Sequence, residues 1–219
     1  MAKDRTWFGG RGAAALLLVL AIAAAPPAVA AMPRLLVLGD SLGAGYGLPS
    51  SQSFPARLAA DLAAKGHPLT LINDSVSGDT SAGGVTRLGD ALARHPQIVL
   101  VELGANDALR AIDPKVTFRN LDRIIARFKA ANIRILLLGM KAPANWGREY
   151  QRRFDAIYPN LAAKYHILLY PFLLEGVALD PALNQPDLLH PNATGAALIA
   201  RRLVPYVLRL LDSSAAAAR

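Results

Sequence analysis

Short apolar runs recur along the chain and are separated by helix-forming stretches. The runs cover residues 34–38, 69–72, 97–103, 133–138 and 167–170. Within them apolar residues follow one another instead of alternating with polar ones, as in strands that are covered on both faces. Helices are predicted between and after them, near residues 52–65, 82–95, 115–131, 148–164 and 193–211. Pro159 lies inside the fourth of these helices.

This alternation predicts an α/β fold with a parallel sheet and helices on both faces. Right-handed crossovers leave few topologies, of which we favour a flavodoxin-like three-layer α/β/α sandwich with a five-stranded sheet in the order 2-1-3-4-5. No repeat or low-complexity linker interrupts residues 34–212. We therefore expect one domain over residues 31–219, with a frayed tail at about residues 213–219.

The first thirty residues resemble a secretory signal. Lys3, Arg5 and Arg11 precede a run of apolar residues at 13–25, and Ala28-Val29-Ala30 fits a cleavage site. The alternative, a transmembrane anchor, needs about 20 apolar residues. We expect residues 1–30 to be a signal peptide that is cut near Ala30, which would leave a periplasmic or secreted protein without a stable membrane anchor.

Composition and charge exclude several function classes. The chain has no cysteine, which rules out disulfides, thiolate catalysis and cysteine-based metal sites. No His or carboxylate cluster has metal-ligand spacing, so we expect no metal and no cofactor. The net charge is +8, and removal of residues 1–30 takes away three positive charges and one negative, which leaves about +6.

The Lys and Arg residues are scattered and do not form one stripe, so a nucleic-acid partner is not expected. Solvated helix faces are the favoured interpretation of these charges. Attraction to anionic membrane surfaces or acyl carriers stays open. No unusual apolar helix face is present, and we expect a monomer.

Four polar loops are expected at the carboxyl edge of the sheet, where open α/β sheets bind their ligands. They cover residues 39–49, 73–80, 104–107 and 187–192. The first three follow strands that are neighbours in the predicted order, so they can converge. Asp40, Asn73 and Asp107 in these loops are interpreted as hydrogen-bonding residues that support the site.

Ser41 is the candidate nucleophile, because it follows a buried strand within a Gly-rich turn. A serine hydroxyl needs a base, which Asp187 and His190 can supply: the carboxylate orients the imidazole, and the other ring nitrogen takes the serine proton. Pro191 fits the first position of the following helix. Taken alone, Ser41 would be interpreted as a helix cap and the Asp-x-x-His motif as a structural pair. Their combination predicts a catalytic triad.

An oxyanion formed at Ser41 needs preorganised donors. The backbone N–H groups of Ser41 and Gly78 and the side-chain amide of Asn106 are the candidates. Taken singly, Gly78 would be interpreted as a glycine required by a turn, and Asn106 as a residue that forms an Asx turn. The pattern Gly39-x-Ser41-x-Gly43 also fits the nucleophile elbow of α/β-hydrolases, but too few residues precede it for that fold.

Together these motifs resemble the GDSL, or SGNH, hydrolases. The matching blocks are Gly39-Asp40-Ser41-Leu42, Gly78, Gly104-x-Asn106-Asp107 and Asp187-x-x-His190. Further stretches are similar to the periplasmic multifunctional acyl-CoA thioesterase, lysophospholipase and arylesterase group. The resemblance covers residues 34–212 and implies hydrolysis of fatty acyl esters or thioesters without a metal.

Two positions depart from the family pattern. The last block of that group usually reads Asp-Gly-Ile-His, and here Leu188 and Leu189 fill its middle; the third usually reads Gly-Gly-Asn-Asp, and here the second Gly is Ala105. Neither change removes a reacting atom.

A pocket for the acyl chain is predicted from Leu42, Leu109, Trp146, Leu188 and Leu189, although leucines in such loops also serve as ordinary core. A carbohydrate or other short-chain acetylesterase and a non-catalytic binding module remain alternatives.

Overall fold

The computed structural model describes Met1 and residues 32–217, with the side chains of residues 213–217 excepted. The predicted signal peptide therefore lies outside the described residues. Residues 32–219 form a compact unit of their own. In the described part of the chain, no helix combines the length and the apolar character needed to cross a bilayer.

The sheet has five strands, all paired in parallel, in the order β2-β1-β3-β4-β5. The strands are β1 (Arg34–Gly39), β2 (Thr70–Ser75), β3 (Ile98–Glu102), β4 (Arg134–Leu138) and β5 (Leu168–Tyr170). The central strands β1 and β3 are buried almost throughout, as their apolar runs predict. The predicted fold class and strand order are confirmed.

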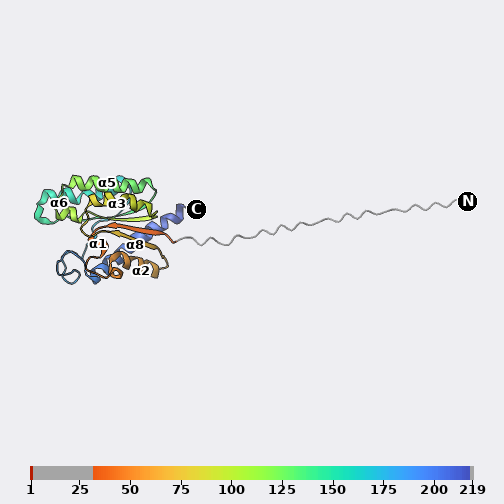
Figure 1. The fold of residues 1–219 in the computed structure, drawn as a ribbon, viewed down its shortest axis with the longest axis horizontal. Coiled ribbons are helices and arrows are strands. Elements are labelled where there is room, and N and C mark those ends of the chain that lie inside the picture. Colours follow the sequence, from red (N-terminus) through yellow and green to blue (C-terminus); the bar gives the residue numbers. More distant parts are fainter. Residues whose placement is uncertain (2–31, 218–219) are drawn as a thin grey trace. The chain divides into compact units, whose positions relative to one another are not determined.

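Helices cover both faces of this sheet (Figure 1). On one face lie α2 (Phe54–Ala64) and α8 (Ala193–Ala217), which pack together. On the other face lie α3 (Ser81–Ala93), α5 (Pro114–Ala130), α6 (Arg148–Asp155) and α7 (Ile157–Tyr165). α8 extends to Ala217, into the segment for which the sequence predicts a frayed tail.

The helix predicted at residues 148–164 is instead two helices, α6 and α7, which meet at Ala156. Pro159 explains the break. It has no N–H to donate to the carbonyl four residues earlier, and its ring would clash there, so a continuous helix is disfavoured. In the first turn of α7 that N–H needs no helical partner.

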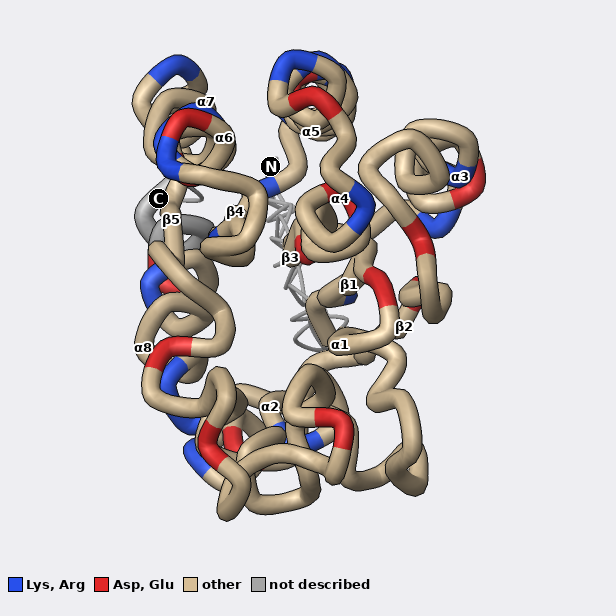
Figure 2. The backbone as a smooth tube through the Cα atoms, turned by 90° about the vertical axis from the view of Figure 1, so that its left-hand side faces the viewer, with Lys and Arg blue, Asp and Glu red and all other residues tan. Residues whose placement is uncertain are grey.

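Short elements at the carboxyl edge of the sheet complete the fold. They are the α-helices α1 (Ser41–Ala44) and α4 (Ala105–Leu109) and the 3-10 helices η1 (Ser50–Gln52) and η2 (Ala144–Trp146). Figure 2 looks onto this edge, with α1 and α4 in front of the strands. Because all the strands are parallel, every loop that follows a strand begins here.

Candidate active site

Ser41 is the first residue of α1, directly beyond the end of β1. Asp40 caps this short helix, and its Oδ1 accepts a hydrogen bond from the N–H of Leu42 at 3.0 Å. Gly43 packs the helix against the sheet: a Cβ there would collide with the side chains of Ser75 and Glu102. The turn therefore holds the Ser41 hydroxyl in a fixed place at the carboxyl edge.

Asp187, His190 and Ser41 are joined by two hydrogen bonds. The Oδ2 of Asp187 lies 2.7 Å from Nδ1 of His190, and Nε2 of His190 lies 2.9 Å from the Oγ of Ser41. The Oδ1 of Asp187 also accepts from the backbone N–H groups of Leu189 and His190, at 2.9 and 3.0 Å. The loop before α8 thus holds both members of the Asp–His pair.

The protonation of the pair follows from these contacts. The backbone hydrogen bond from His190, followed by the one between the two side chains, lowers the pKa of Asp187 to about 2. At neutral pH Asp187 is therefore a carboxylate, which can only accept hydrogen bonds. Nδ1 of His190 must carry a proton, and Nε2 is left to accept the proton of Ser41.

Two neighbours of His190 were not predicted from the sequence. The ring of Tyr46 lies against the imidazole, with ring centroids 4.7 Å apart. Nε2 of Gln185 donates to the carbonyls of Tyr46 at 2.6 Å and Pro191 at 3.1 Å. Gln185 therefore links the loop after α1 to the loop that carries His190. Tyr46 belongs to the Gly-rich loop 39–49, but no sequence rule assigned its ring to the imidazole.

The start of α8 differs from the sequence expectation. Pro191 is not its first residue, because α8 begins at Ala193. Asn192 precedes it, and its Oδ1 accepts from the N–H groups of Thr194 and Gly195 at 2.9 and 3.0 Å. This is the pattern of an N-cap, whose side-chain oxygen satisfies otherwise unpaired amides. The cap fixes the end of the His190 loop.

Besides the N–H of Ser41, the predicted oxyanion donors are Gly78, which follows β2, and Asn106, which follows β3; these strands lie on either side of β1. Nδ2 of Asn106 donates to Oδ2 of Asp40 at 3.1 Å, so the amide is tied to the Ser41 turn and keeps a second N–H. Gly78 has a φ of 83°, a conformation that suits glycine. Its carbonyl accepts from Nη2 of Arg110 at 2.9 Å, which joins this loop to the end of α4.

A buried carboxylate beneath Ser41 was missed by the sequence reading. Glu102, at the end of β3, is fully buried, and its Oε2 accepts from the N–H groups of Asp40 and Gly43 at 3.0 and 2.9 Å. Oε1 of Glu102 is buried and has no hydrogen-bond partner among the described residues. The carboxyl group therefore supports the Ser41 turn through one oxygen only.

Burial decides how this pair titrates. Burial raises the pKa of Glu102 well above its usual value, and the charge of Asp40 raises it further. Burial also raises the pKa of Asp40, to about 6, although hydrogen bonds from Leu42 and Asn106 favour its charged form. Burial therefore favours the protonated form of both carboxyl groups, while Asp40 accepts from Asn106.

Asp107 and Asn73 make the supporting hydrogen bonds that the sequence predicts. Asp107 is buried and accepts from the N–H of Ser81, from its hydroxyl and from the hydroxyl of Thr117, at 2.8, 2.5 and 3.0 Å. It therefore joins α4 to the starts of α3 and α5. Nδ2 of Asn73 donates to the carbonyl of Gly43 at 2.9 Å and so ties β2 to α1.

The five residues predicted to form an acyl pocket do not share one environment. Leu42 is buried, whereas Leu109, Trp146, Leu188 and Leu189 are exposed on different loops. A cavity beside Ser41 and His190, also lined by Leu42 and Tyr46, has a volume of about 10 Å³. That is room for about one water molecule, so it cannot enclose an acyl chain.

The two departures from the family pattern fall on different backbone conformations. Ala105 is the first residue of α4 and needs no glycine; the residue with a positive φ, of 115°, is the preceding Gly104. Leu188 has a φ of 57°, in the left-handed region. The family pattern has glycine at this position, and a leucine is strained there.

Within the described residues, no three His, Asp or Glu side chains form a group that could hold a metal.

The family model of the GDSL-like lipase/acylhydrolase family matches residues 37–198. An arylesterase of Vibrio mimicus is 41% identical over 182 residues, which are 81% of this chain and 91% of that protein. The protein of Escherichia coli K12 named thioesterase 1/protease 1/lysophospholipase L1 is 45% identical over 183 residues, which are 81% of this chain and 86% of that protein.

A solved structure agrees with these relatives. The esterase AlinE4, described as a member of the SGNH-hydrolase family, superimposes with a TM-score of 0.69 at 43% identity, over 82% of this chain and 96% of that one. The motifs, the fold and the similarity to these proteins lead to one conclusion. The chain belongs to the GDSL-like lipase/acylhydrolase family and is a serine ester hydrolase of the SGNH type.

Proposed function

We propose that this enzyme hydrolyses fatty acyl esters and thioesters, with Ser41 as the nucleophile, His190 as the general base and Asp187 as the residue that orients it. The observation that carries the proposal is the continuous chain of hydrogen bonds from Asp187 through His190 to Ser41, at 2.7 and 2.9 Å. Arylester, thioester and lysophospholipid substrates follow from the names of the relatives.

The reaction proceeds through an acyl-enzyme. His190 takes the proton of Ser41 as its Oγ attacks the acyl carbonyl, and the negative charge develops on the former carbonyl oxygen. The N–H groups of Ser41 and Gly78 and the free N–H of Asn106 stabilise this oxyanion. The C–O or C–S bond then breaks, and His190 protonates the leaving alkoxide or thiolate. Water deacylates Ser41 by the same route.

The test measures initial rates on p-nitrophenyl esters from acetyl to palmitoyl, followed by acyl-CoA and lysophospholipid. Ser41→Ala should lower kcat by about 10⁴-fold or more, whereas Ser51→Ala, a change at an exposed serine in η1, should not. Asn106→Ala should lower kcat by about 10²- to 10³-fold with a smaller change in KM, because its amide acts on the transition state.

Each other outcome has a clear meaning. A sharp optimum at acetyl would replace this proposal with a short-chain acetylesterase at the same site. Full turnover by Ser41→Ala would contradict the mechanism. If the wild type hydrolyses none of these esters, the site is a binding scaffold and the proposal is wrong.

We also propose that residues 1–30 direct export and that cleavage near Ala30 releases a periplasmic or secreted monomer. The basic start, the apolar run and the Ala-x-Ala site support this. Expression of the full chain in a Gram-negative host, fractionation and the mass of the released protein test it. Retention of the whole chain in the inner membrane would contradict it.

A further inference from the structure

Large exposed apolar side chains lie on the loops at the carboxyl edge of the sheet, the edge that also carries Ser41. They come from the loops that follow β1, β2, β3 and β4 and from the loop before α8, and each is at least 37% exposed: Tyr46, Val76, Leu109, Trp146, Leu188 and Leu189. Parallel strands bring these loops to one edge of the sheet, the one that faces the viewer in Figure 2. We call these six residues the apolar rim.

A pocket for one acyl chain does not account for the rim. The cavity at Ser41 and His190 is only about 10 Å³, and the rim residues point into solvent from separate loops. Exposed apolar surface bordered by polar residues is typical of surfaces that bind a partner or a membrane. Trp and Tyr, both present in the rim, favour the boundary between water and lipid.

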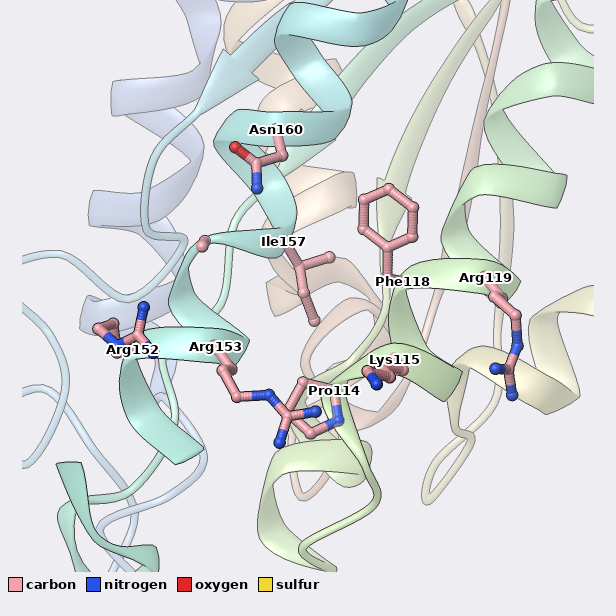
Figure 3. Close-up of a pocket in the computed structure, with 9 residues that line it drawn as sticks. Pro114, Lys115, Phe118, Arg119, Arg152, Arg153, Ile157 and Asn160 are labelled. Carbon is pink, nitrogen blue, oxygen red and sulfur yellow. The ribbon is translucent and has the colours of Figure 1, made fainter. Parts of the chain in front are cut away.

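Positive charge borders the rim. Arg110 and Lys141 are exposed after β3 and β4, and Arg148 is exposed at the start of α6. Beside them a hollow of about 490 Å³ lies between the start of α5 and the α6–α7 segment. Figure 3 shows Phe118 and Ile157 in this hollow, with Arg152 and Arg153 on one side and Arg119 on the other.

The hollow keeps a net positive charge. Lys115, Arg119, Arg152 and Arg153 line it, and two carboxylates offset them: Asp113 pairs with Arg153 at 2.8 Å and Glu149 with Arg152 at 2.7 Å. Four cations against two anions leave an excess of two. The elements that line the hollow follow two rim residues closely in the chain, since α6 begins two residues after Trp146 and α5 five residues after Leu109.

We propose that the apolar rim and the basic hollow together dock on an anionic phospholipid surface. The rim side chains enter the acyl boundary, and the Lys and Arg side chains meet the phosphate groups. Such docking places Ser41 at the surface from which acyl substrates partition, a consequence that rests on the proposed function. The partner is a lipid surface, because apolar and cationic groups lie side by side on one edge.

Docking can be measured on residues 32–219, the compact unit that remains when the predicted signal peptide is left out. This removes the apolar segment at 13–25, which would bind lipid independently, and leaves Trp146 as the sole tryptophan. The Ser41→Ala form should float with vesicles of phosphatidylcholine and phosphatidylglycerol in equal amounts. The emission of Trp146 should then shift to the blue, and binding to pure phosphatidylcholine should be weaker.

Variants locate the surface. Lys141→Ala should lower partitioning roughly fivefold, the effect of about one charge close to an anionic membrane. Lys65→Ala, which removes an exposed lysine at the end of α2 on the opposite edge, should leave it unchanged. Leu188→Ser combined with Leu189→Ser should weaken binding to both vesicle types.

Three results would overturn the proposal. The first is no flotation with either vesicle type, and the second is an equal loss of vesicle binding in Lys65→Ala and Lys141→Ala. The third is a dimer in solution that the Leu188→Ser and Leu189→Ser changes dissociate. The last would assign the rim to a second copy of the chain. Because binding is measured without Ser41, its failure is distinguishable from failure of the proposed function, which appears as no hydrolysis of dissolved esters by the wild type.

Discussion

At the scale of single residues, Leu188 holds a backbone conformation that an L-residue adopts at a cost. Its φ is 57°, whereas Leu189 beside it has no positive φ, and the two side chains are similarly exposed. Glycine relieves the left-handed strain only at the first position. The free energy of unfolding of Leu188→Gly should therefore exceed that of Leu189→Gly by roughly 1 to 2 kcal/mol. Urea denaturation of both variants measures this; equal values would show that Leu188 is not strained.

The pair of Glu102 and Asp40 makes stability depend on pH. Burial raises the pKa of Asp40 from 3.8 to about 6, and that of Glu102 is raised as well. Between about pH 4 and 6 the folded protein thus holds protons that the unfolded chain releases, so the free energy of unfolding falls as pH rises. The stabilisation from these protons is complete below about pH 4 and is lost as pH rises through the folded pKa values.

Glu102→Gln should reduce this dependence, because an amide keeps an oxygen for the two backbone N–H groups and does not titrate. Between pH 5 and pH 8 the variant should lose less stability than the wild type, by about 1 to 3 kcal/mol. The control is Glu149→Gln, a change at an exposed glutamate in α6, which should follow the wild type. Parallel curves for Glu102→Gln and the wild type would contradict the raised pKa of Glu102.

The motif residues could be predicted from the sequence because their spacing carries the chemistry. Ser41, Asp187 and His190 were selected by type and order, and the structure places them within hydrogen-bond distance; their catalytic roles stay predictions. Glu102 was missed because it lies near the end of an apolar run, where it is interpreted as a single polar residue of a strand. Its position two residues before Gly104 was the available signal. Tyr46 was missed because ring contact depends on tertiary packing.

At the scale of elements, two prolines inside predicted helices, Pro159 and Pro205, have different effects. Pro159 lies in the first turn of α7, where its missing N–H is harmless, and Pro205 lies in the interior of α8 and is exposed. Pro205→Ala should therefore raise the free energy of unfolding by about 1 to 3 kcal/mol. Pro159→Ala should change it by less than about 0.5 kcal/mol. Denaturant unfolding compares the two. A loss of stability in Pro205→Ala would show that the packing of α8 requires the proline.

The five strands were predictable because each is an apolar run bounded by loops, and right-handed crossovers leave few possible strand orders. Helix ends were placed within a few residues, except that Pro159 divides α6 from α7 and that α8 continues to Ala217, six residues beyond its predicted end. The helices α1 and α4 were not predicted, since four or five residues are too few to show a helical period. Both follow central strands, and they carry Ser41 and Asn106.

At the scale of the whole molecule, activity and stability should depend on the polypeptide alone. EDTA should leave hydrolysis unchanged, because every proposed step uses a side chain or a backbone amide. Dithiothreitol should leave Tm unchanged, because the chain has no cysteine. Rates and thermal unfolding with and without each reagent test this. Activity that is lost in EDTA and restored by a divalent metal would contradict the mechanism.

The described domain begins and ends at the edge of the sheet opposite Ser41. β1 starts there, and α8 runs back to it from the loop of His190 (Figure 1). An affinity tag, a resin linkage or a fused display protein attached at either end therefore projects away from the catalytic edge. The enzyme can be immobilised through its termini with Ser41 facing outward, towards dissolved or particulate substrate.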